Sequence, residues 1–166
     1  MQRQEIDHIK SDYQRIFFVE LTGHESRPGM KGTRGLGPTM AMTEVVGLGH
    51  MGGNNYLLSL LAGHGEYAAL GRFARLRGWP TSQAGVGSLL DPPISIHRIN
   101  GKTLQFLVRR VGPATTALTS LSIGASVRLI GPLGRGLDEL DPGFREKKWY
   151  LVAGGIGLGP MPSLLE

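Results

Sequence analysis

The feature that most constrains this chain is a series of short apolar runs, each separated from the next by glycine- or proline-containing turns. The runs are TEVVGL from Thr43, YLLSLLA from Tyr56, RFARLRGW from Arg72, PISIHRI from Pro93, KTLQFLVRRV from Lys102 and ASVRLIG from Ala125. Short strands at such spacing are typical of an antiparallel sheet closed into a small barrel. The 26 glycines and 10 prolines in 166 residues supply the turns and argue against a helical bundle. The sequence therefore predicts a mainly β fold with five or six barrel strands.

Two segments depart from this strand pattern. GPATTALTSLSIG, from Gly112, has threonines before an apolar stretch, which favours one short helix. WYLVAGGIGLGPMPSLLE, from Trp149, has a dense apolar run typical of a strand buried in a parallel sheet, followed by a glycine loop and a helix start. We therefore predict a barrel domain over residues 43–142 and the beginning of an α/β nucleotide-binding domain over residues 147–166.

The N-terminal part of the chain carries a different pattern. Ile6, Ile9, Tyr13, Ile16 and Phe17 recur at helical spacing, which favours a short amphipathic helix. Residues 23–40 are rich in glycine and basic side chains and have no hydrophobic period, as in a linker or a disordered segment. We interpret residues 1–42 as an extension that is partly disordered.

The amino-acid composition argues against several classes of function. The chain has no cysteine, which excludes disulfides, thiolate catalysis and cysteine-bound metal within it. No apolar run approaches the roughly 18 residues that span a bilayer. The net charge of +5 suits a phosphate-bearing cofactor as well as nucleic acid, but no lysine or arginine run exceeds two residues. We expect no nucleic-acid or membrane partner, and a cytoplasmic location.

Two glycine-containing corners are candidates for binding phosphate. One follows the last apolar strand and contains Gly155 and Gly157, with Pro160 at the start of a helix. The other is GPATT, beginning at Gly112, where a strand runs into a short helix with the hydroxyls of Thr115 and Thr116. In both, glycine lets backbone N–H groups approach a phosphate. Both also have a purely structural interpretation, as a tight turn and as a helix cap.

The DPPISIHR segment is a third candidate. Alternation along a strand places Ser95, His97 and Ile99 on one face, and Ile94, Ile96 and Arg98 on the other. No histidine and aspartate match Ser95 as a hydrolase triad, and a lone histidine such as His97 is more often a surface or core residue than a catalyst. Nearby arginines form a cationic set from which one or two could reach phosphate; they are Arg72, Arg75, Arg77, Arg98, Arg109 and Arg110.

Taken in order, five motifs resemble the ferredoxin-reductase superfamily of flavoproteins, and within it the electron transfer subunits of dihydroorotate dehydrogenase. They are GRFARLRGW, PPISIHRI, FLVRRVGPATTAL, GASVRLIGPLGRGL and WYLVAGGIGLGPMPSLL, and the resemblance runs from Glu44 to Glu166. It implies a six-stranded antiparallel barrel that binds FAD, followed by a domain that binds NAD(P).

The resemblance assigns roles to particular residues. The flavin signature Arg-Pro-x-Ser stands here as Pro92, Pro93, Ile94 and Ser95, so that Ser95 approaches the flavin ring and His97 follows where further contacts are expected. The signature arginine that holds the FAD phosphates is replaced by Pro92, for which Arg98, Arg109 or Arg110 would have to compensate.

The phosphate motifs of the superfamily are also represented. The pyrophosphate motif Gly-x-Gly-Thr keeps Gly112 and Thr115, followed by Thr116, and Gly155 and Gly157 correspond to the phosphate loop for the nicotinamide nucleotide. No residue is predicted to be a catalytic acid or base.

In that family electrons pass between a nicotinamide, FAD and a [2Fe–2S] cluster, coupled to a catalytic subunit that oxidises dihydroorotate, or to another redox partner. Here the resemblance includes only the first strand and turn of the nicotinamide domain, and the cluster's cysteines are absent. We therefore expect an FAD-binding electron-transfer domain of an NAD(P)H-linked oxidoreductase. The alternative is a fragment that is not catalytic alone, either a weak flavin-binding module or a remnant.

Overall fold

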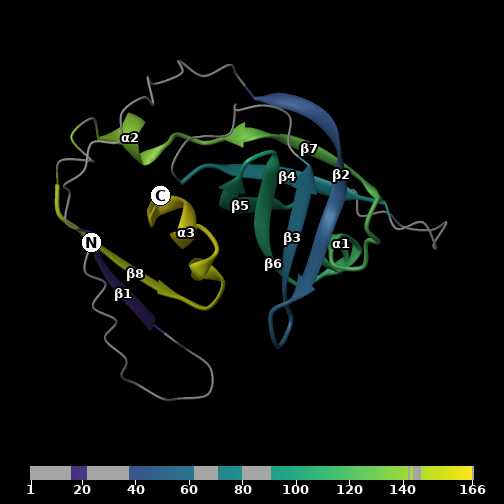
Figure 1. Cartoon of the computed structure of the whole chain (residues 1–166), viewed down its shortest axis with the longest axis horizontal. Coiled ribbons are helices and arrows are strands. Elements are labelled where there is room, and N and C mark those ends of the chain that lie inside the picture. Colours follow the sequence, from purple (N-terminus) through teal and green to yellow (C-terminus); the bar gives the residue numbers. More distant parts are fainter. Residues whose placement is uncertain are drawn as a thin grey trace.

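A computed structural model of the chain describes residues 16–21, 38–61, 71–79, 91–141, 143 and 147–165 (Figure 1). Strands and helices follow one another in the order β1 (Ile16–Leu21), β2 (Thr39–His50), β3 (Asn55–Leu61), β4 (Phe73–Gly78), β5 (Pro93–Asn100), β6 (Thr103–Arg109), α1 (Pro113–Leu118), β7 (Ser126–Leu133), α2 (Leu137–Leu140), β8 (Trp149–Gly154), the 3₁₀-helix η2 (Gly155–Leu158) and α3 (Met161–Leu165). Among these elements, no helix is both long and apolar enough to cross a membrane.

Six of the strands form a closed barrel with the order β2-β3-β6-β5-β4-β7. Every neighbouring pair in it is antiparallel. The predicted mainly β fold with a six-stranded antiparallel barrel is therefore confirmed. Closure leaves the barrel without an unpaired edge strand, which suits strands of only six to twelve residues.

Alternation along the strands places one apolar face inside the barrel. In β6, Leu104, Phe106 and Val108 are fully buried, while the residues between them are only partly buried. The buried core consists of Val45, Leu58, Leu60, Ala74, Leu76, Ile96, Leu104, Phe106, Val108, Leu118, Leu121, Val127 and Leu129. The tight turn from β5 to β6 contains Gly101 at a φ of 58°, a conformation that glycine adopts without strain.

Helix α1, the short helix predicted after β6, packs against β4 and covers the core with Leu118, and Leu121 in the segment after the helix is buried as well. The contact is close: a Cβ atom at Gly78 in β4 would lie 2.6 Å from a terminal carbon of Leu121. Glycine at this position therefore lets the segment after α1 approach the sheet. The packing holds fixed the chain corner that connects β6 to the helix.

A bulge in β5 changes the predicted facing of its side chains. Ile96 pairs with Phe106 of β6, whereas Arg98 pairs with the next residue, Gln105, so His97 is an extra residue in the ladder. The shift brings Ile99 onto the core side with Ile96. The prediction that Ile99 shares a face with His97 was wrong, because strict alternation assumes a regular ladder.

The last strand, β8, lies outside the barrel and pairs with β1 in an antiparallel two-stranded sheet, so the prediction of a strand buried in a parallel sheet was wrong. Figure 1 shows this pair beside the barrel, with α3 on the side of β8 that faces it. The predicted N-terminal helix was wrong for Ile16 and Phe17, which are in β1; the rest of that prediction lies outside the described residues. Pairing with β8 and the β-branched and aromatic residues of IFFVEL explain the strand.

Candidate functional site

A cavity of about 510 Å³ opens between the start of β5 and the corner that leads into α1. Its lining consists of Asp91, Pro92 and Pro93 from the first segment and Val111, Gly112, Pro113, Ala114 and Thr115 from the second. These two segments are 20 residues apart in the sequence, and the β5–β6 hairpin places them side by side. The cavity therefore joins two of the three segments that sequence analysis singled out.

Gly112 leaves space at the cavity wall. Its backbone is extended, with φ at −165°, so other residues could adopt the same conformation. A Cβ atom at Gly112 would meet no atom of the described residues within 4 Å. A side chain here would therefore project into open space without disturbing the fold, and glycine keeps that space open to a ligand.

The Thr115 hydroxyl has a structural role at this corner. Its oxygen accepts hydrogen bonds from the backbone N–H groups of Val111, at 3.0 Å, and Gly112, at 3.1 Å, and the hydroxyl donates to the Gly112 carbonyl. The amide of Thr116 donates to the same carbonyl at 2.8 Å, and the side chain of Thr116 is exposed. In the first turn of α1, Pro113 has no N–H, whereas the amides of Ala114 and Thr115 have no partner within the helix. Backbone amides, more than hydroxyls, are the donors that this corner offers.

The predicted flavin residues of β5 follow the cavity along the strand. Pro93 lines the cavity, Ile94 packs against the barrel core, and Ser95 is half-buried opposite Phe73 of β4. Ser95 is on the same strand, two residues beyond the last lining residue of β5, and does not line the cavity itself. The structure thus brings Pro93, Gly112 and Thr115 together, with Ser95 two residues farther along.

His97 contacts the C-terminal segment instead of the cavity. Its Nδ1–H donates a hydrogen bond of 2.7 Å to the carbonyl oxygen of Gly159, which can only accept, so the proton is on Nδ1. Gly155, with φ at 56°, lies beside Arg109: a Cβ atom there would be 3.4 Å from the Arg109 guanidinium. Gly157 is exposed. The two glycines of the predicted nicotinamide loop therefore lie on η2, next to β6, and do not line the cavity.

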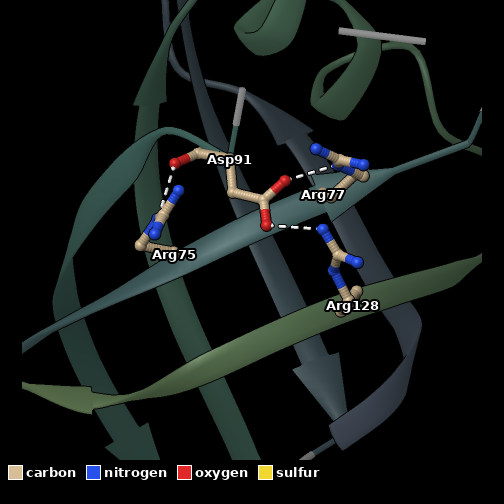
Figure 2. A network of polar contacts seen from close by, with 4 residues as sticks. All are labelled: Arg75, Arg77, Asp91 and Arg128. Carbon is tan, nitrogen blue, oxygen red and sulfur yellow. Dashed lines mark hydrogen bonds and ion pairs between the residues drawn. The ribbon is translucent and has the colours of Figure 1, made fainter. Parts of the chain in front are cut away.

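One cavity residue, Asp91, is the centre of an arginine cluster (Figure 2). Asp91 is only 6% exposed. Its carboxylate accepts hydrogen bonds from Nε of Arg77 on β4 and from Nη2 of Arg128 on β7, the latter at 2.7 Å. Its carbonyl oxygen accepts a third from Nε of Arg75 at 3.2 Å. Figure 2 shows Arg75 on one side of Asp91 and the other two arginines on the opposite side.

These contacts determine the ionisation of Asp91. Burial by itself raises the pKa of the Asp91 carboxyl group, but the hydrogen bonds from Arg128 and Arg77, with their positive charges, outweigh it. The pKa of Asp91 therefore lies below its ordinary value, and the side chain is a carboxylate at neutral pH. The cluster is a set of ionised groups at the cavity wall.

The sequence alone does not reveal this cluster. Arg77 is one of the six candidate cations, whereas Asp91 is only the first residue of the DPPISIHR segment and Arg128 is not among the candidate cations. Among the arginines predicted to compensate for Pro92, Arg109 donates to the Asn55 side chain, and Arg110 donates to Thr119 and stacks on Tyr56. Neither of these two lines the cavity. The cluster could be predicted only by knowing that β4 and β7, which each carry an arginine, are neighbours and that Asp91 lies beside them. This strand order cannot be read from a single sequence.

Among the residues that the structure describes, no three or more histidine, cysteine, aspartate or glutamate side chains are grouped as metal ligands.

Comparison with known proteins relates the chain to one kind of subunit. It is 37% identical over 80 residues to the electron transfer subunit of dihydroorotate dehydrogenase B (NAD(+)) from Clostridium perfringens, covering 48% of this chain and 31% of that protein. It is 36% identical over 111 residues to the same subunit from a Geobacillus species, covering 64% and 41%. The Clostridium acetobutylicum subunit is 35% identical over 100 residues, covering 58% and 36%. The chain thus spans less than half the length of these relatives.

Other comparisons are less informative. No protein-family profile matches the chain. Among solved structures, the ferredoxin reductase of carbazole 1,9a-dioxygenase is similar with a TM-score of 0.45 and 19% identity, covering 58% of this chain and 29% of that one, which is too distant to bear on function. Over the matched residues the chain is a homologue of the dihydroorotate dehydrogenase electron transfer subunits, as the order of its motifs predicted.

Proposed function

We propose that this chain, a homologue of dihydroorotate dehydrogenase electron transfer subunits, binds FAD at its barrel and acts as an electron-transfer domain of an NAD(P)H-linked oxidoreductase. The observation that carries the proposal is the cavity between Pro93 and Gly112. It unites the two segments in which the flavin signature and the pyrophosphate motif were recognised. Its volume of about 510 Å³ is within the range of cofactor and ligand sites.

The residues at the cavity fit a dinucleotide. The amides of Ala114 and Thr115 in the first turn of α1 are donors suited to phosphate oxygens, and Gly112 leaves the approach open. The Thr115 hydroxyl holds the corner in shape through its hydrogen bonds to Val111 and Gly112. Pro93 and Ser95 then form the side of the site along β5, where the flavin ring would lie. When bound, FAD would supply the ability to accept electrons in pairs and release them singly.

Electron donor and acceptor are also part of the proposal. The relatives are named as NAD(+)-linked electron transfer subunits, which supports a nicotinamide nucleotide as one reactant and a catalytic dihydroorotate-oxidising subunit as the partner. This chain contributes β8, η2 and α3 toward the nicotinamide side, with Arg109 beside Gly155 as a cation for phosphate. These 166 residues contain no cysteine, so they supply no thiolate ligand to a [2Fe–2S] cluster.

The test is a fluorescence titration of the purified chain with FAD. We expect saturable binding by the wild type and at least about tenfold weaker binding by Gly112→Leu, because the added side chain fills the cavity in an allowed backbone conformation. Gly49→Leu is the matched control: a Cβ atom at Gly49 on β2 also meets no described atom within 4 Å, and Gly49 does not line the cavity.

Three results are informative. Weaker binding in Gly112→Leu with normal binding in Gly49→Leu supports the proposed site. Equal FAD affinity in Gly112→Leu and wild type would place the cofactor elsewhere. A wild-type chain that binds no FAD would contradict the proposal and favour the alternative, a fragment or remnant that has lost the cofactor.

A further inference from the structure

We propose that Arg77 and Arg128, held in place by Asp91, form a cationic wall behind the cavity that selects a ligand carrying phosphate. This inference rests on the proposed function, in which the cavity holds part of FAD. It adds residues of β4 and β7 that no motif assigns to ligand binding. Neither arginine lines the cavity, so both act on a ligand through their positive charge, from positions that Asp91 holds.

The pairing of β4 with β7 places two arginines side by side, so that a negatively charged partner between them is needed. Arg77 of β4 and Arg128 of β7 are directly opposite each other in the antiparallel ladder, where two like charges repel. Asp91 enters from the segment before β5 and accepts a hydrogen bond from each, through different carboxylate oxygens. The bridge fixes both guanidinium groups and, at the same time, the start of β5 that forms one wall of the cavity.

The charges do not cancel. Asp91 contributes one negative charge, whereas Arg77, Arg128 and Arg75 are all cationic and all bonded to it. Counted over these four side chains alone, the charge is positive, and the cluster lies one hydrogen bond behind a residue that lines the cavity. The other lining residues are mostly apolar, including Pro92, Pro93 and Val111. Apolar walls weaken the screening by water, so the field of the cluster extends into the cavity.

Arg128 is the best placed of the cations to act in this way. Its Nη2 is bonded to Asp91, and its guanidinium lies 5.9 Å from the ring centre of Trp79. Its Nε is buried and has no hydrogen-bond partner among the described residues. The guanidinium group is thus held in position by two neighbours, as expected for a preorganised cation. A phosphate diester or diphosphate is the ligand chemistry that such a wall favours.

The experiment compares FAD affinity at about 50 mM and about 500 mM salt in wild type, Arg128→Gln, Arg128→Lys and Lys102→Gln. We expect Arg128→Gln to bind FAD about tenfold more weakly at low salt and to show a smaller salt dependence than wild type. Arg128→Lys keeps the charge and should retain most of the salt dependence. Lys102→Gln removes one positive charge from the exposed turn at the far end of β5, ~23 Å from Pro93, and should resemble wild type.

Salt dependence separates this role from a structural one. If Arg128→Gln weakens FAD binding with an unchanged salt dependence, or leaves the affinity unchanged, the cationic wall is refuted while FAD binding itself stands. An equal loss in Lys102→Gln would show that only overall charge matters and would also refute it. A wild type that binds no FAD at either salt concentration contradicts the proposed function instead. Circular dichroism of each variant confirms that the barrel is intact.

Discussion

The barrel and the β1–β8 pair are both antiparallel sheets, yet they are held together in different ways. Among the described residues, thirteen apolar side chains are buried in the barrel, in helix α1 and in the segment that follows the helix. On β8, by contrast, only Ala153 is buried, while Tyr150 and Val152 are 66% and 58% exposed. An isolated two-stranded sheet is marginal in water. The barrel is therefore expected to fold by its own core, whereas the β1–β8 pair depends on its attachments to the rest of the chain.

The same difference separates the two candidate phosphate sites. The cavity is built from the start of β5 and the corner before α1, both anchored on the barrel core. The glycine loop after β8 reaches the barrel through a few contacts: His97 with Gly159, and Arg109 beside Gly155. A site on a rigid scaffold keeps its geometry without a ligand, so we expect FAD binding to be a property of the barrel. Binding at the glycine loop would depend on how firmly that segment is attached.

The largest expected effect tests the contrast in burial. Phe106→Ala removes a fully buried ring from β6 and should lower the free energy of unfolding by about 3–5 kcal/mol. Tyr150→Ala makes a similar truncation on β8, where the ring is 66% exposed, and should change it by less than about 0.5 kcal/mol. Urea denaturation followed by circular dichroism measures both. Equal losses would mean that β8 belongs to the same cooperative core, and the contrast between the two sheets would be wrong.

A smaller effect tests the contribution of Asp91, which holds the arginine cluster at the cavity, to the stability of the barrel. The pKa of Asp91 is raised by burial and lowered more strongly by Arg128 and Arg77, so it lies below its ordinary value. A lowered folded-state pKa stabilises the fold above the unfolded value of about 3.9, and that stabilisation is lost as pH falls through the folded-state pKa. Asp91→Asn should therefore cost about 2 kcal/mol at pH 7, and the difference from wild type should narrow below about pH 4.

Urea denaturation of both proteins between about pH 7 and pH 3 gives this difference directly. Asp141→Asn is the control: Asp141 pairs with Lys147 in the connection before β8, where both side chains are partly exposed, and it should have a smaller effect. A constant gap between Asp91→Asn and wild type across the whole pH range would show that the Asp91 carboxylate contributes through its shape and not through its charge.

The sequence predicted the features that depend on neighbouring residues and missed those that depend on pairing between distant segments. Alternating apolar residues and glycine turns predicted the barrel, and the GPATT corner predicted α1, because period and turn chemistry are local properties. The bulge at His97 and the partner of β8 were not predictable in this way. Both depend on strand pairing between distant segments: β8 is paired by β1, more than a hundred residues away. The arginine pair around Asp91 depends on the same long-range order.

The smallest effect concerns the attachment of the C-terminal segment. His97→Ala removes a hydrogen bond to Gly159, worth about 1 kcal/mol, and should make amide hydrogen exchange over residues 155–165 about fivefold faster without changing global stability. His50→Ala is the matched control, because the Nε2 of His50 is also 2.7 Å from a carbonyl oxygen, that of Gly53 in the β2–β3 turn.

Loss of the His50 contact should leave exchange over residues 155–165 unchanged, because the β2–β3 turn does not hold that segment. If His97→Ala also leaves it unchanged, the packing of α3 on β5 holds the segment by itself. The glycine loop would then be as firmly attached as the barrel site, and the difference drawn between the two candidate phosphate sites would not hold. If exchange accelerates in both α3 and β8, His97 stabilises the whole attached unit, and the bulge in β5 joins the C-terminal segment to the barrel.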